Sequence, residues 1–99
     1  MDQAAVSDRC AQALQKSADV AKQIMDEKLS AEEGAHLIAS NLGDCYEYLN
    51  SDIAAVDLLG AISAYSDFYQ EYRLDAAALT EIDQDVVKAA AELLRLMTD

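Results

Sequence analysis

The chain of 99 residues has no proline and no tryptophan, and it has only three glycines, two cysteines and one histidine. Proline ends a helix and glycine weakens one, so their scarcity, together with abundant alanine and leucine, favours long helices. Strand patterns are absent. With one histidine, the chain offers few ways to build a nucleophile–histidine catalytic site, and it has no glycine-rich motif that would bind phosphate. We therefore expect an all-α protein that is not an enzyme and needs no cofactor.

Lysine and arginine are missing from the centre of the chain. Residues 29–72 hold eight acidic residues and no lysine or arginine, so this stretch contributes −8 to the formal net charge of −12, with histidine counted as neutral. A protein that binds nucleic acid needs cations to displace counterions from phosphate, and anionic membranes also attract cations. The composition thus argues against direct contact with nucleic acid or with a membrane surface.

Long apolar runs are missing too, because Asp57 interrupts the longest one. No segment therefore predicts a membrane span, and the first residues lack the pattern of a secretory signal, so we expect a cytoplasmic location. The two cysteines have no C-x-x-C spacing, which argues against a zinc or thioredoxin-type site. In a reducing compartment Cys10 and Cys45 are expected to be free thiols packed in the core. A disulfide between them is the alternative, because a helical hairpin would bring them close.

Apolar residues recur every three or four positions in four segments, which is the spacing of amphipathic helices. The predicted helices cover about residues 3–28, 30–49, 52–72 and a final segment that begins at Asp75 or at Thr80. Ser30 and Glu33 have capping-box spacing and mark the second start. The cluster at residues 50–52 predicts a turn and a new N-cap before the third helix. Gly43 followed by Asp44 could split the second helix.

Four such helices with short connections predict a single domain over residues 1–99, an antiparallel four-helix bundle of up-down-up-down order. The third helix is apolar on most sides, since Asp57 is its one charged residue between Ile53 and Ser66. The apolar surface of this helix exceeds what a monomeric bundle would bury. A homodimer or a partner-binding groove is therefore a secondary inference.

All six aromatic residues lie within the stretch that lacks cations, and three tyrosines share one stripe at the end of the third helix, near two acids. In an antiparallel pairing this end lies beside the start of the second helix, which carries more acids and the histidine. The partner-binding residues predicted on this basis are Glu32, Glu33, His36, Tyr65, Asp67, Tyr69, Glu71 and Tyr72. Aromatic and acidic surface suits a basic partner. The alternative is that the rings cover an alanine-rich core and the acids keep the protein soluble.

Three functional hypotheses follow. The first is a small acidic interaction module that covers a basic surface of a partner protein, in the manner of an inhibitor or a nuclease immunity protein; the analogy is one of strategy, without a shared motif. The second is a homo-oligomeric helical scaffold without catalytic activity. The third is a metal site in a dimer, because Glu33-x-x-His36 has the spacing used in carboxylate-bridged bundles. Against the third, the helix cap already explains Glu33, and His36 lies in a first helical turn.

Overall fold

The computed structural model describes residues 6–98, and these residues form helices and turns without any strand. The helices are α1 (Asp8–Met25), α2 (Ala31–Asn41), the 3₁₀ helix η2 (Leu42–Tyr48), α3 (Ala54–Glu71) and α4 (Ala76–Thr98). The predicted all-α class is confirmed.

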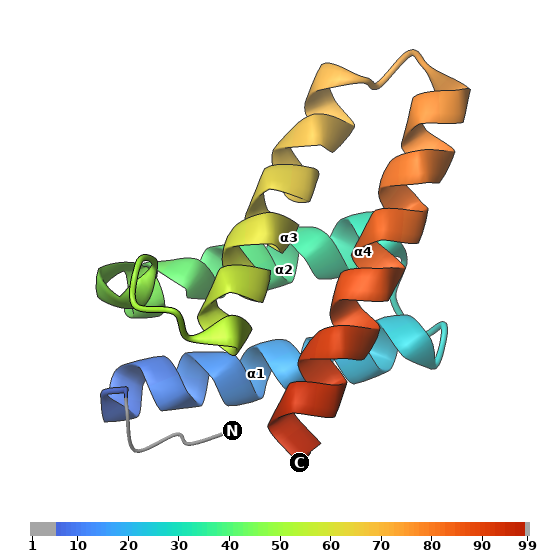
Figure 1. Ribbon diagram of the computed structural model, residues 1–99. Coiled ribbons are helices and arrows are strands. Elements are labelled where there is room, and N and C mark those ends of the chain that lie inside the picture. The colour runs from blue at the N-terminus through green and yellow to red at the C-terminus, as the bar shows by residue number, and fades with distance from the viewer. Residues whose placement is uncertain (1–5, 99) are drawn as a thin grey trace.

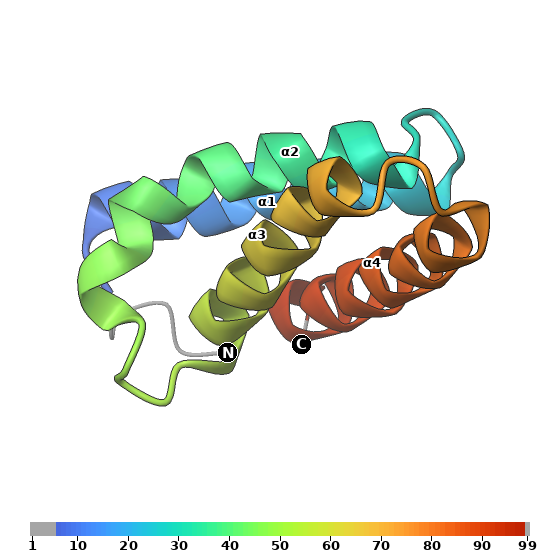
Figure 2. The ribbon, with the colours of Figure 1, turned by 90° about the horizontal axis from the view of Figure 1, so that it is seen from above.

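The helices form two antiparallel hairpins that pack as two layers. Helices α1 and α2 make the first hairpin, and α3 and α4 make the second, which crosses the first steeply (Figure 1). Figure 2 shows the hairpins as separate layers seen from above. Each helix packs on the next in the chain, and α4 packs back on α1, which is the neighbour order of an up-down-up-down bundle. Because the hairpins cross, the end of α3 and the start of α4 project beyond the first layer. We call this segment, residues 68–80, the hairpin tip.

The core lies where the apolar stripes of all four helices meet. Its fully buried side chains include Leu14, Ile38, Leu59, Ile62, Val86 and Leu93. Helix α2 also approaches α1 closely at Gly34, where an added Cβ would overlap the Ile24 side chain. A larger residue would force the Ile24 side chain to move, so close approach, and not backbone conformation, favours glycine there.

The helix starts show which capping predictions hold. The Ser30 hydroxyl accepts a hydrogen bond from the Glu33 amide at 3.1 Å, so the predicted start of α2 is confirmed. Asp75 accepts from the Ala78 amide at 3.0 Å and is the cap of α4, which decides against Thr80. The N-cap predicted at residues 50–52 is wrong: Ile53 occupies that position without a side-chain cap. Asp52 lies in the preceding turn with a left-handed φ of 58°.

Two predicted helices are shorter than expected. Helix α1 begins at Asp8, and the part of the prediction at residues 3–5 lies outside the described residues. The second predicted helix is α-helical only to Asn41 and then tightens into η2, which contains Gly43 and Asp44. The change of helix type occurs near the predicted break.

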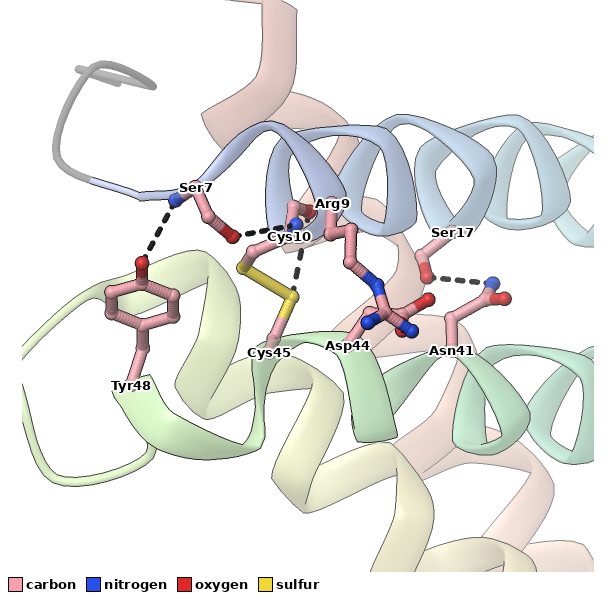
Figure 3. The surroundings of a disulfide bond; sticks show 8 residues. All are labelled: Ser7, Arg9, Cys10, Ser17, Asn41, Asp44, Cys45 and Tyr48. Atoms are coloured by element: carbon pink, nitrogen blue, oxygen red, sulfur yellow. Dashed lines mark hydrogen bonds and ion pairs between the residues drawn. A yellow bond between two sulfur atoms is a disulfide. The ribbon is translucent and has the colours of Figure 1, made fainter.

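The free-thiol prediction is also wrong. Cys10 and Cys45 are fully buried and form a disulfide that joins α1 to η2, with their Cα atoms 4.7 Å apart (Figure 3). The α1–α2 hairpin creates this proximity. Two further contacts join the same segments, since the Ser7 amide donates to the Tyr48 hydroxyl at 2.8 Å and Arg9 pairs with Asp44 at 2.9 Å. These six residues form what we call the crosslinked end.

Candidate functional site

The end of α3 lies beside the start of α2, and Arg73 connects them. Arg73 is the first lysine or arginine after the acidic stretch at residues 29–72. Arg73 donates to both carboxylate oxygens of Glu32, from Nη1 to Oε1 at 3.0 Å and from Nη2 to Oε2 at 2.6 Å. These hydrogen bonds hold the pKa of Glu32 below its usual range, and they raise the pKa of Arg73. Glu32 is therefore compensated within the chain and is not a free anion for a partner.

The side chain of His36 is half exposed, but contacts within the chain also hold it. Its Nδ1 shares a hydrogen bond with the Ser66 hydroxyl, and its Nε2 lies 3.6 Å from a Glu32 oxygen. The imidazole ring meets the Tyr69 ring edge-on, with 6.2 Å between centroids. Among residues 6–98 no three His, Cys, Asp or Glu side chains are grouped so that they could hold a metal ion. Glu33 lies exposed in the first turn of α2.

Tyr69 is a core residue. It is 2% exposed, and its hydroxyl donates to Asp83 Oδ1 of α4 at 2.5 Å. Burial, and then the hydrogen bond to the Asp83 carboxylate, raise the pKa of the Tyr69 phenol. This ring links α3 to α4 from within and is not available to a docking partner.

The exposed rings form a different row on α3. Tyr65 and Phe68 have centroids 6.4 Å apart, and Phe68 and Tyr72 have centroids 6.2 Å apart. Phe68 is 38% exposed and Tyr72 is 43% exposed, whereas Tyr65 is half-buried. Phe68 was not among the predicted site residues, although its i, i+3, i+7 spacing with the two tyrosines was present in the sequence.

The outer edges of α3 and α4 form one continuous surface, since the two helices pack against each other. A pocket of about 280 Å³ marks one end of it, lined by Ala54, Asp57, Leu58, Glu92 and Leu96. Steps of seven residues, or two helical turns, lead from Leu58 to Tyr65 and then to Tyr72 on the α3 side. On the α4 side, steps of seven and then four residues lead from Glu92 back to the exposed residues Asp85 and Glu81. We call this surface the α3–α4 groove: Leu58, Tyr65, Phe68 and Tyr72 from α3, with Glu81, Asp85 and Glu92 from α4.

Acidic residues also border the other side of the aromatic row. Asp57 and Glu71 are exposed and fourteen positions apart, so they share a face of α3 next to Phe68. Asp67 is exposed one row further from the groove. Lys88 is a basic residue on the exposed side of α4, one turn from Asp85 and from Glu92. The aromatic row thus lies between two rows of carboxylates.

A larger hollow lies on the opposite edge of α4. Its volume is about 550 Å³, and it is lined by Ile24, Met25, Glu27, Leu29, Ser30, Ala31, Asp83 and Val87. It has no aromatic residue in its lining. Val87 is 38% exposed, the same fraction as Phe68, and this makes it a matched control position away from the α3–α4 groove.

Comparison with known protein families, curated proteins and solved structures finds no match for this chain. Within residues 6–98, no helix combines the length and hydropathy that a membrane span requires. The functional argument therefore rests on the chemistry of the described surface.

Proposed function

We propose that this protein is a small acidic helical binding module that docks through the α3–α4 groove on a basic surface of a partner protein. One observation carries the proposal: an exposed aromatic row lies between two rows of carboxylates. Aromatic side chains supply a large contact area for little conformational entropy and dominate many interfaces. Carboxylates beside them can form charge-assisted hydrogen bonds with arginines of the partner.

The charge of the chain supports a partner that is itself cationic, such as a nuclease or another nucleic-acid-binding protein. A net charge of −12 on 99 residues repels nucleic acid and attracts the proteins that bind it. A module that covers such a protein's basic groove would act as an inhibitor. Its association should be fast at low salt and slow at high salt.

A homo-oligomeric scaffold is the second candidate, because another copy of the chain could cover Phe68 and Tyr72. Two copies would each bring a charge of −12 to the contact, which opposes self-association at low salt. Sedimentation at several protein concentrations separates the candidates. A concentration-dependent dimer that Phe68→Ser abolishes would favour the scaffold.

The disulfide bears on where the protein acts. Disulfides persist in oxidising compartments and are rare in the reducing cytosol. In place of the cytoplasmic location expected from composition, we propose an oxidising compartment. Thiol alkylation in the native host before lysis tests this point, since a chain that reacts fully at both cysteines would contradict it.

The proposed function is tested with the partner captured from the native host at low salt. The double variant Phe68→Ser with Tyr72→Ser should weaken binding to the captured protein about tenfold or more. The matched control Val87→Ser removes an equally exposed apolar side chain outside the groove and should leave affinity unchanged. Binding of the parent should weaken steeply as salt rises. Affinity that neither salt nor the double variant alters would overturn the proposal.

A further inference from the structure

We infer that the partner element that fills the α3–α4 groove is a cationic amphipathic helix. This inference rests on the proposed function and deepens it. The groove has an arrangement that such a helix complements: apolar and aromatic side chains follow α3 lengthwise, and exposed carboxylates lie on both sides of them. We call the apolar row its floor and the two rows of carboxylates its rims. An amphipathic helix with basic residues on both sides of its apolar stripe has the matching arrangement.

The length of the groove suits a helix. Helix α3 has 18 residues, so its outer edge runs for about 27 Å at the usual rise per residue. The floor follows α3 for about 21 Å of this length, from Leu58 through Tyr65 to Tyr72 at its C-cap. A partner helix of about the same number of residues would lie along both helices and add a third member to the hairpin.

The size of the side chains along the floor changes from one end to the other. This predicts where the partner helix carries its large and its small apolar side chains. At the end near the pocket the outward side of α3 carries small residues, the half-buried Ala61 and the exposed Ala64. Toward the hairpin tip it carries the rings of Phe68 and Tyr72. A bound helix therefore needs large apolar side chains over the alanines and smaller ones over the rings, since close packing excludes voids and overlap.

The rims are not equally anionic along their length. Glu92 is already paired with Arg95, which donates to it from Nε at 3.0 Å and lowers the pKa of its carboxyl. Lys88 adds a positive charge to the same part of α4. Glu81 and Asp85 therefore make the stronger part of the α4 rim, nearer the tip, and Glu71 faces them across the rings. The basic residues of the partner should gather at this end.

A helix from a second copy does not fit this description. Helix α1 is the one with most cations, carrying Arg9, Lys16 and Lys22, but its apolar face is buried in its own core. The groove therefore calls for a helix from a different protein.

The test uses synthetic peptides of about 18 residues, the length of α3. One has leucine at i, i+3 and i+7 spacing with arginine on both flanks; the second has the same composition in scrambled order; the third has glutamate in place of arginine. Calorimetry gives affinity and circular dichroism gives helix content. The amphipathic basic peptide should gain helix on binding, the scrambled peptide should bind about tenfold more weakly, and the acidic peptide should not bind.

Variants of the protein locate the site. Glu81→Lys with Asp85→Lys should weaken the amphipathic peptide about tenfold, and Lys88→Glu should strengthen it several-fold. Val87→Ser should have no effect. Equal binding of the ordered and scrambled peptides, or full affinity in the Glu81 and Asp85 double variant, would overturn the inference. If none of the three peptides binds, the inference is also wrong. The proposed function is wrong only if, in addition, the captured natural partner binds the groove variants as tightly as the parent.

Discussion

The crosslinked end and the hairpin tip differ in how the chain is held. At the crosslinked end a buried disulfide, the Ser7–Tyr48 hydrogen bond and the Arg9–Asp44 ion pair join α1 to η2. At the tip the buried ring of Tyr69 reaches the core, the Tyr69–Asp83 hydrogen bond and the Arg73–Glu32 ion pair add polar contacts, and Leu74 is fully exposed. The covalent constraint therefore joins segments that precede α3, and the hairpin tip is held without one.

This difference explains how a small chain can present an exposed hairpin. Helix α3 starts just after η2, and η2 is a 3₁₀ helix of seven residues, longer than the three or four at which most such helices stop. The disulfide holds η2 against α1, so the origin of α3 is positioned and its far end can project. We expect the crosslinked end to be the more stable of the two, while Phe68 and Tyr72 near the tip stay exposed.

Removal of the disulfide should have the largest effect. The bond closes a loop with a sequence separation of 35, and loop-closure entropy assigns about 3–4 kcal/mol of stability to a loop of that size. The double variant Cys10→Ala with Cys45→Ala should lose about this much free energy of unfolding, measured by urea denaturation. Dithiothreitol should destabilise the parent similarly and leave the double variant unchanged. If dithiothreitol leaves the free energy of unfolding of the parent unchanged, the disulfide does not stabilise the crosslinked end as proposed.

A smaller effect is expected inside the tip. Tyr69→Phe removes the hydrogen bond to Asp83 and should cost about 1.5–3 kcal/mol, since a hydrogen bond to a charged group contributes on this scale. The raised pKa of Tyr69 also predicts a pH dependence. The stabilisation should be fully present below about pH 10, the ordinary tyrosine value, and should be lost as pH rises toward the higher pKa of the folded state.

Denaturation of the parent and of Tyr69→Phe from pH 8 to 11 measures both effects. Tyr46→Phe is the control, because Tyr46 is an exposed ring at the other end of the molecule. The gap in stability between the parent and Tyr69→Phe should narrow as the pH rises above 10. A gap that stays constant to pH 11 would show that the Tyr69 phenol is not held neutral by its surroundings.

The smallest effect is expected at the Glu32–Arg73 pair on the surface of the tip, because solvent screens exposed ion pairs. The lowered pKa of Glu32 means that the pair stabilises the fold above the ordinary carboxyl range near pH 4.5. That contribution should be lost as pH falls through the lower pKa of the folded state. Glu32→Gln should therefore unfold at a slightly higher pH than the parent in an acid titration. Glu33→Gln, one position away and exposed, is the control, and equal midpoints for all three proteins would rule out this role for the pair.

Much of the fold could be predicted from the sequence because its signals are local. The four helical segments follow from apolar spacing, and the start of α2 follows from Ser30 and Glu33, since a cap depends on residues within one turn. The start of α3 was mispredicted because the turn before it uses Asp52 in a left-handed conformation, which leaves Ile53 at the N-cap. Several polar residues can form such a turn, and composition does not say which one will be the cap.

The candidate site was only partly predictable, because neighbouring positions on a helix point about 100° apart. The sequence places Phe68 and Tyr69 side by side in an aromatic segment. The rotation of α3 against α2 and α4 turns Tyr69 into the core and leaves Phe68 in the exposed row. The same packing brings Arg73 onto Glu32 across 41 positions of the chain.

The sequence by itself determined the helical class, the acidic centre and the presence of aromatic residues in that centre, because periodicity and charge are properties of local sequence. The tertiary structure alone decided the Cys10–Cys45 pairing, the orientation of each ring and the compensation of Glu32. These features depend on how helices rotate and cross, and that geometry is set by the packing of the whole core and not by any one segment.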